Sequence, residues 1–230
     1  MSSVNNLPGS IVAATSGSIG FDCDVSLNAA SVKAFVSDGF KFVVRYLSLG
    51  STQHSNDLSV TEAAAILENG LALMAVQHVM LSEWSPTKTL GVSNGTNAAN
   101  NALSIGLPNN VTVWLDLEGI NSNSSAADVI EYCNSWFSAV TSAGYLPGLY
   151  VGANCILNSN ELYYDLNVSR YWKSGSNTPT VAVRGFCVVQ TINNSFVHDG
   201  ISYDKDIIQT DNNGNTPNWL VLDMSQSLNS

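Results

Sequence analysis

Short apolar segments alternate along the chain with segments whose apolar residues recur at helical spacing. An apolar run bounded by turn residues predicts a buried strand, and apolar residues three or four positions apart predict a helix that faces a core. Strands are expected at residues 18–24, 40–47, 71–79, 111–119, 146–152, 170–172, 185–191 and 201–208, and helices at 27–39, 59–70, 97–106, 125–144 and 158–166. The helix over 125–144 carries Val129, Tyr132, Trp136 and Val140 on one face.

Several positions mark where these elements begin and end. Ser59 precedes the second helix and Glu62 follows three residues later, which predicts a capping box, and Gly70 ends the same helix. A long polar connection that contains Gly91 is expected after the third strand. The segment around Trp219 is expected to pack as a closing segment.

Apolar strands that alternate with helices are typical of a parallel sheet covered on both sides. Eight strands in this rhythm predict an α/β fold, a (β/α)8 TIM-type barrel whose helices are missing or reduced in the second half. An open doubly wound sheet is the alternative. It normally has a Gly-rich phosphate loop after its first strand, where this chain has Asp22, Cys23 and Asp24. Residues 1–17 are expected to be a flexible N-terminal tail, and residues 18–230 a single barrel domain.

Acidic residues stand at the ends of several predicted strands. Asp116 and Glu118 point to the same face of a strand, and repulsion between adjacent carboxyl groups raises one pKa and leaves the other group ionised. Such acids can also cap a helix or pair with an arginine, and Arg45 is the obvious partner. In a barrel, Asp22 and Asp204 would lie at the same mouth, where barrel enzymes have their active sites.

Aromatic and amide residues are expected at comparable positions on the other strands. Aromatic faces and amide groups around carboxylates suit a sugar, whose CH faces stack while its hydroxyls form hydrogen bonds. The residues expected to bind substrate in this way are Arg45, Tyr46, Gln77, Tyr150, Trp172 and Gln190. Each of them, taken alone, also fits ordinary rim or core packing.

Composition narrows the possible partners. The chain has 230 residues, of which 45% are hydrophobic and 11% charged, and its net charge is −10 with only 8 Lys and Arg residues. Phosphate binding needs clustered cations, so nucleic acids and anionic membranes are not expected as partners. No stretch approaches the length of a membrane span, and the first 17 residues lack the basic and apolar regions of a signal peptide.

Cysteines and histidines give little support to a metal centre. The four cysteines, Cys23, Cys133, Cys155 and Cys187, form no C-x-x-C pair and are expected to be buried small hydrophobes rather than disulfide partners. The chain has three histidines and no H-E-x-x-H motif. Neither a metal nor another cofactor is therefore expected.

Four segments together resemble glycoside hydrolase family 25 lysozymes, and resemble even more the related bacterial glycoside-hydrolase-like domains of unknown function. These segments are residues 20–22, 114–118, 143–150 and 190–206. Residues 21–23 and 45–47 are particularly similar to the second group. The resemblance covers about residues 18–210, and its motifs are specific only in combination.

The resemblance implies a role for each acid. Glu118 matches the general acid of the lysozymes, and Asp116 the carboxylate that assists at the anomeric centre. Asp22 matches the acid of the first strand and Asp204 the acid of the last strand. Asp206 stands where the family has Asn, and we expect it among the substrate-binding residues.

Hydrolysis of a glycosidic bond needs one protonated carboxyl group at the leaving oxygen and one ionised carboxylate. We expect apolar neighbours to raise the pKa of Glu118, and hydrogen bonds to keep Asp116 ionised. The clustered acids and the resemblance together imply a hydrolase of peptidoglycan or a related amino-sugar polymer, extracellular or cell-wall-directed without a recognisable signal peptide. It is expected to be most active at acidic pH.

Two other hypotheses stay open. One is a catalytically inactive barrel that binds a glycan or serves as a structural or cargo domain. The other is a metal-dependent deacetylase or phosphatase, which would need a set of His and Asp ligands. The sequence does not discriminate a retaining from an inverting mechanism, and it leaves the oligomeric state open.

Overall fold

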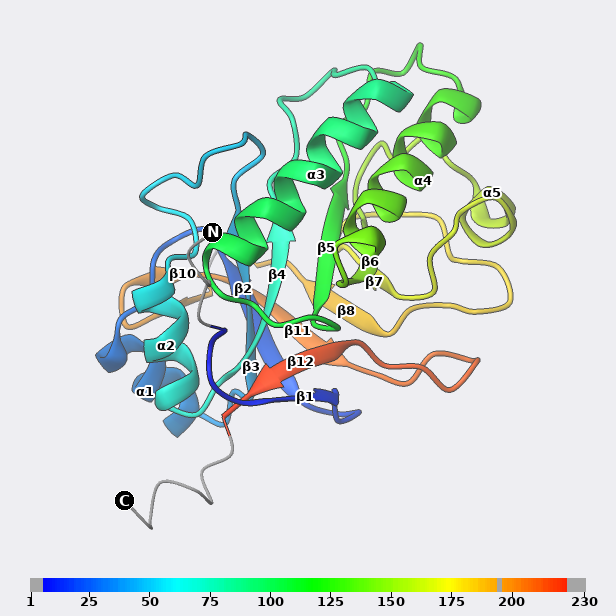
Figure 1. Cartoon of the computed structure of the whole chain (residues 1–230). Coiled ribbons are helices and arrows are strands. Elements are labelled where there is room, and N and C mark those ends of the chain that lie inside the picture. Colours follow the sequence, from blue (N-terminus) through cyan, green and yellow to red (C-terminus); the bar gives the residue numbers. More distant parts are fainter. Residues whose placement is uncertain (1–5, 194–195, 223–230) are drawn as a thin grey trace.

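The computed structural model describes residues 6–193 and 196–222 (Figure 1). Eight of its strands are β2 (Ile19–Cys23), β3 (Phe42–Leu47), β4 (Ala72–Gln77), β5 (Thr112–Leu117), β6 (Leu146–Val151), β7 (Tyr171–Lys173), β8 (Val188–Thr191) and β11 (Asp204–Ile208). Within the described residues, these eight strands close a barrel in the order β4-β3-β2-β11-β8-β7-β6-β5, because β5 also pairs with β4. The predicted α/β barrel is confirmed.

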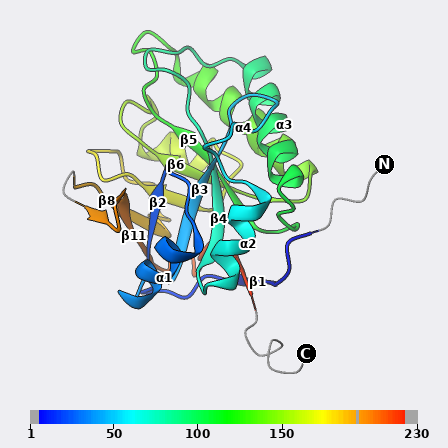
Figure 2. The same ribbon diagram turned by 90° about the vertical axis from the view of Figure 1, so that its left-hand side faces the viewer.

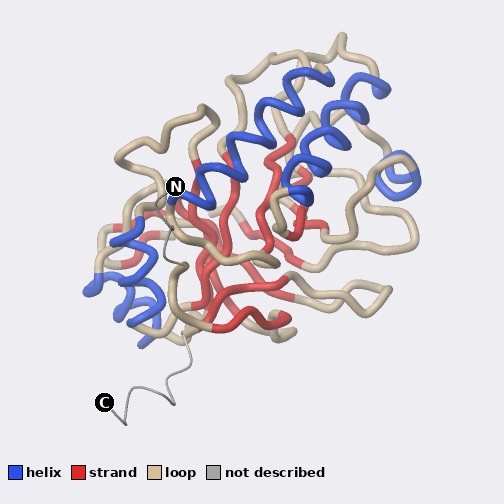
Figure 3. Tube along the Cα trace, in the orientation of Figure 1, coloured by secondary structure: helices blue, strands red, loops and turns tan. Residues whose placement is uncertain are grey.

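Helices cover the outside of the barrel (Figure 3). They are α1 (Ala29–Ser37), α2 (Val60–Glu68), α3 (Lys88–Ser104), α4 (Ala126–Ser142) and α5 (Ser159–Tyr164). One helix follows each of the strands β2 to β6, whereas the described residues that follow β7 and β8 contain none. The predicted loss of helices in the second half is therefore confirmed. No helix in the described ranges is long and apolar enough to cross a membrane.

Helix α3 begins at Lys88, well before the predicted start at residue 97. The Thr87 hydroxyl caps it by accepting a hydrogen bond from the Leu90 N–H at 3.2 Å. Gly91 therefore lies within the helix, and a side chain there would overlap the Tyr132 carbonyl oxygen of α4. The glycine lets α3 and α4 pack closely, and they lie side by side in both ribbon views (Figures 1 and 2).

The last barrel strand runs opposite to the direction expected for a (β/α)8 barrel. Strand β11 is antiparallel to both β2 and β8. The predicted strand over 201–208 is divided, because Ile201–Ser202 form a separate strand, β10, which pairs with β9 (Val197–His198). A hairpin thus replaces the crossover helix, and antiparallel neighbours need no long crossover.

Two further strands lie side by side at one end of the barrel (Figure 1). Strand β1 (Ser10–Ala13) pairs with β12 (Asn218–Val221), and β12 pairs with β4. The prediction of a flexible tail is therefore wrong for residues 10–13, whose backbone groups are paired, while residues 1–5 lie outside the described part. The Trp219 ring packs 5.7 Å from the Phe42 ring, as expected of a closing segment.

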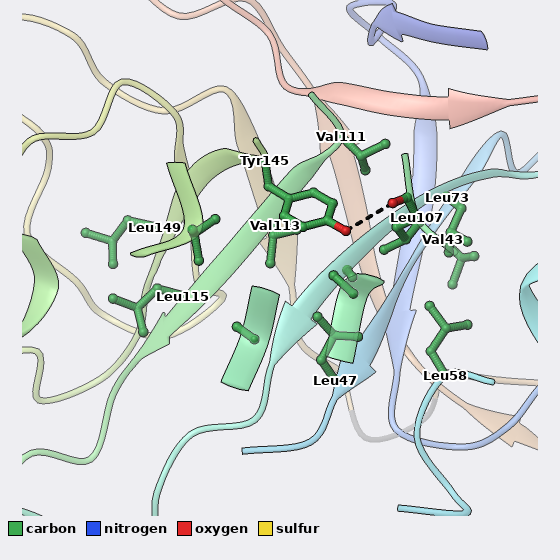
Figure 4. Packing of buried hydrophobic residues seen from close by; sticks show 14 of the residues in the cluster. Val43, Leu47, Leu58, Leu73, Leu107, Val111, Val113, Leu115, Tyr145 and Leu149 are labelled. Carbon is green, nitrogen blue, oxygen red and sulfur yellow. Dashed lines mark hydrogen bonds between the residues drawn. The ribbon is translucent and has the colours of Figure 1, made fainter. Parts of the chain in front are cut away.

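Alternating side chains build two apolar layers, because the barrel strands are buried on both faces. The inner layer fills the barrel with Phe42, Val44, Met74, Trp114 and Trp172 among others. The outer layer lies between strands and helices and includes Val43, Leu73, Val113, Leu115 and Leu149 (Figure 4). All four cysteines are buried and unpaired, which confirms that they act as small hydrophobic residues.

Candidate active site

A cavity of about 510 Å³ opens at the end of the barrel where the parallel strands finish. Its described lining consists of Asp22, Cys23, Asp24, Tyr46, His78, Val79, Asp116, Glu118, Asn193, Phe196, Ser202, Tyr203 and Asp204. All four predicted catalytic acids are in this set. Asp204 reaches the mouth from the first position of an antiparallel strand rather than from the end of a parallel one.

Strand β5 and the residue after it carry the central pair of acids. Asp116 is only 6% exposed, and its Oδ1 has no hydrogen-bond partner among the described residues. Burial raises the pKa of Asp116 well above its usual value, and the charges of Glu118 and Asp22 add to the shift. The hydrogen bonds expected to favour the ionised form of Asp116 are thus absent at Oδ1 among the described residues.

Glu118 lies nearer to solvent than Asp116 and is half-buried. Burial raises the pKa of Glu118, in the direction expected for a general acid. Hydrogen bonds hold the backbone at Glu118 and at the residue before it. The Trp84 indole N–H donates to the Glu118 carbonyl oxygen at 2.8 Å, and the Gly152 N–H donates to the Leu117 carbonyl oxygen at 3.0 Å.

The second pair of acids comes from neighbouring strands. Asp22 of β2 lies directly opposite Asp204 of β11, as expected if the last strand closes against the first. The Gln190 amide donates to Asp22 Oδ2 at 2.7 Å, and the Tyr46 hydroxyl donates to Asp22 Oδ1 at 3.4 Å. Burial raises the pKa of Asp22 to about 7 despite these hydrogen bonds, and burial also raises the pKa of Asp204.

Tyr150, Gln190, Trp172 and Asp206 lie around and beneath these acids rather than in the cavity lining. The Tyr150 hydroxyl donates to Gln190 Oε1 at 2.9 Å, so both side chains help to hold Asp22. The Trp172 indole N–H donates to Asp206 Oδ1 at 2.8 Å. Asp206 is fully buried, and burial raises its pKa well above the usual value, with the Asp22 charge adding to the shift.

Arg45 and Gln77 do not reach the cavity, which corrects their predicted place at its rim. Both side chains point outward from the barrel, because they alternate with the inward-facing Val44 and Val76. Arg45 is fully buried beneath the helices and donates from Nε to Glu62 Oε1 at 2.7 Å. Gln77 accepts a hydrogen bond from the Trp136 indole at 2.8 Å.

Glu62 therefore does not complete the predicted capping box. The Ser59 hydroxyl accepts a hydrogen bond from the Glu62 N–H at 3.1 Å, as expected. The Glu62 carboxylate, however, accepts from Arg45 and from the Leu27 N–H at 2.8 Å. A buried guanidinium without a carboxylate would be costly, and this requirement overrides the local capping pattern.

The cavity also contains residues that were not among the predicted site residues. His78 Nε2 forms a hydrogen bond with Oδ1 of the buried Asp57 at 2.8 Å. The His78 ring also stacks on the Tyr46 ring, with ring centroids 4.4 Å apart. Phe196 and Tyr203 enter from the β9–β10 hairpin. Asp199 and Gly200 both have positive φ, and the Asp-Gly pair was the available signal for that two-residue turn.

The lining of the cavity is strongly acidic. Its described residues include five carboxyl groups and neither Lys nor Arg. No group of three or more His, Cys, Asp or Glu side chains in the described residues is arranged to hold a metal ion. The cavity therefore presents carboxyl groups, hydroxyls and aromatic rings to a ligand.

Comparison with known proteins agrees with this architecture. The sequence profile of the Rv2525c-like, glycoside hydrolase-like domain matches residues 33–218. No curated protein sequence is significantly similar to the chain. Among solved structures, the Tat-secreted protein Rv2525c of Mycobacterium tuberculosis, in complex with L-tartrate, has a TM-score of 0.62 at 17% identity. That alignment covers 84% of this chain and 96% of the other.

Lysozymes and muramidases share the same fold. The bacterial lysozyme of Streptomyces coelicolor aligns with a TM-score of 0.56 at 16% identity, over 85% of this chain and 93% of its own. The muramidase of Trichobolus zukalii aligns with a TM-score of 0.53 at 18% identity, over 83% of this chain and 93% of its own. At these identities, the comparison concerns the fold alone.

Proposed function

Since the chain belongs to the Rv2525c-like glycoside hydrolase-like domain family, we propose that it hydrolyses glycosidic bonds of peptidoglycan or a related amino-sugar polymer. The main support is the pair Asp116 and Glu118, which lie two residues apart at the end of β5 and line the same cavity. The lysozyme and muramidase folds among the structural neighbours support the same class of substrate.

Glu118 is the proposed general acid. Its carboxyl group is half-buried and its pKa is raised, so it retains a proton to a higher pH than an exposed glutamate. A protonated carboxyl group at the cavity wall can transfer that proton to the leaving glycosidic oxygen. Glu118 is also the more exposed member of the pair, which suits contact with a bulky polymer.

Asp116 is the proposed partner carboxylate, and it must lose its proton to stabilise positive charge at the anomeric carbon. Its buried Oδ1 lacks a partner among the described residues. A hydrogen-bond donor of the substrate at this atom would favour the ionised form and lower the pKa of Asp116. In this proposal, substrate binding itself favours the ionised form of Asp116. Asp22 and Asp204 line the opposite wall and would contact the sugar hydroxyls.

The proposal is tested with purified protein, its Glu118→Gln variant and a Glu68→Gln control, in which an exposed helix residue loses the same charge. Each protein is incubated with peptidoglycan and with chitin-type oligomers at acidic and neutral pH. New reducing ends are then detected by mass spectrometry. Product from the wild type and the control, but not from a folded Glu118→Gln variant, is expected. Product from none of the three would contradict the proposal.

A glycan-binding or structural barrel without turnover is the second candidate. The deep burial of Asp116 favours it, because burial opposes the ionised form that would stabilise an oxocarbenium-like state. Retention of the oligomers by the wild type, with no product after long incubation, would support this candidate. For the hydrolase and for the glycan-binding barrel alike, we propose a glycan as the partner and an extracellular or cell-wall-directed location, in line with the Tat-secreted structural neighbour.

A further inference from the structure

Two aromatic rings form one wall of the acidic cavity. Phe196 and Tyr203 line it together with Ser202 and Asp204. Their rings stack with centroids 5.5 Å apart and an interplanar angle of 14°. The stacking follows from the hairpin register. Val197 pairs with Ser202, so Phe196, which precedes Val197, lies opposite Tyr203, which follows Ser202. The Tyr203 N–H donates to the Phe196 carbonyl oxygen at 3.2 Å.

Tyr203 anchors this pair to the body of the protein. Its ring meets Phe21, Phe35 and Phe40 edge-on, at centroid distances of 5.7, 5.3 and 5.6 Å. On the same hairpin, the His198 ring lies 4.6 Å from the Phe35 ring. The hairpin is therefore packed against α1 and β2, and its aromatic wall has a fixed position.

Phe196 has a different environment from Tyr203. Tyr203 is the only ring in the described residues with which Phe196 makes a ring contact, and Phe196 is only partly buried. Core packing of the hairpin is thus provided by Ile201, Tyr203 and His198. A partly exposed aromatic ring in a cavity of carboxyl groups is suited to the apolar CH face of a neutral ring.

The strand order places this wall across the mouth from Glu118. Strand β11, which directly follows the hairpin, is separated from β5 by three strands in either direction round the barrel. A linear glycan whose glycosidic oxygen lies at Glu118 would extend across the mouth toward the hairpin. From this geometry we infer that Phe196, backed by Tyr203, is a stacking subsite for a pyranose ring away from the cleaved bond. The inference rests on the proposed glycan substrate.

Binding is measured without turnover, in a Glu118→Gln background, by calorimetry with chitin-type oligomers of increasing length. Phe196→Ala should weaken binding of the longer oligomers by roughly three- to tenfold, and Phe196→Trp should preserve it. Phe196→Leu keeps apolar bulk without a ring and should resemble the alanine variant. Tyr164→Ala removes an aromatic side chain that is 67% exposed outside the cavity and should change nothing.

The outcomes separate this inference from the proposed function. Equal affinities for the parent and for folded Phe196→Ala and Phe196→Leu variants would overturn the subsite alone. No binding of any oligomer by the parent protein would overturn the glycan substrate and the subsite together. A loss confined to the longest oligomers is expected, because the shortest do not span the distance from Glu118 to the hairpin.

Discussion

At the scale of single residues, Gly152 determines where the Glu118 carboxyl group can lie. A Cβ atom at this position would overlap Glu118 Cβ and would lie 2.6 Å from Glu118 Oε2. The glycine follows β6, the strand that pairs with β5. Because Gly152 has no side chain, the Glu118 side chain can lie directly against the backbone that follows β6.

Gly152→Ala should therefore displace the Glu118 carboxyl group. We expect turnover of oligomers to fall by about 10- to 100-fold, because small misplacements of a reacting group are costly, with little change in KM. Steady-state kinetics and an NMR titration of Glu118 are the measurements. Gly50→Ala is the matched control, since a Cβ atom there has no neighbour within 4 Å in the described part of the chain. Unchanged kinetics and titration in folded Gly152→Ala would refute the positioning role.

At the scale of elements, the close packing of α3 against α4 depends on glycines within α3. Helix propensity alone predicts that replacing Gly91 by Ala stabilises the protein by up to about 1 kcal/mol. The added methyl group would, however, overlap the Tyr132 carbonyl oxygen and lie 2.9 Å from its carbon atom. Because those are backbone atoms, whole helices must separate. Packing should therefore outweigh propensity.

We expect Gly91→Ala to lower the free energy of unfolding by about 1–3 kcal/mol, the usual cost of overpacking. Urea unfolding followed by circular dichroism measures the change. Gly50→Ala again provides a substitution without a clash. A stabilised Gly91→Ala protein would show that propensity dominates and that the two helices can move apart at little cost.

At the scale of the whole molecule, the cluster of raised carboxyl pKa values links stability to pH. The pKa of Asp22 rises from 3.8 to about 7, mainly through burial, and those of Asp116 and Asp206 rise well above 3.8. Each group binds its proton more tightly in the folded than in the unfolded state. For each group, the free energy of unfolding should therefore fall as pH rises from its pKa in the unfolded chain to its pKa in the folded protein.

The urea midpoint is expected to be higher at pH 5 than at pH 8, as measured by tryptophan fluorescence. Asp22→Asn should reduce the difference, because the amide does not titrate. A midpoint that rises with pH would contradict the prediction, since it would require carboxyl pKa values below those of the unfolded chain. The acidic optimum expected for activity is a separate prediction and stays untested.

The sequence by itself determined those features that depend on local periodicity. Alternating strands and helices predicted the barrel, and the spacing of Asp116 and Glu118 placed both on one strand face. Four acids predicted at strand ends indicated one acidic mouth, and the cavity contains all four, although Asp204 stands at the start of an antiparallel strand. These inferences succeeded because the side-chain period of a strand is fixed by backbone geometry and needs no knowledge of the neighbours.

Tertiary structure alone decided which face of each strand lies inside and how the last strand runs. Strands β3 and β4 are apolar on both faces, so nothing local marked Arg45 and Gln77 as outward-facing. The burial of Asp116 and the antiparallel β11 depend on contacts between distant segments, and so does the packing of Tyr203, the ring on which Phe196 stacks, against Phe21 and Phe35. Barrel closure creates these contacts, and no single stretch of sequence encodes it.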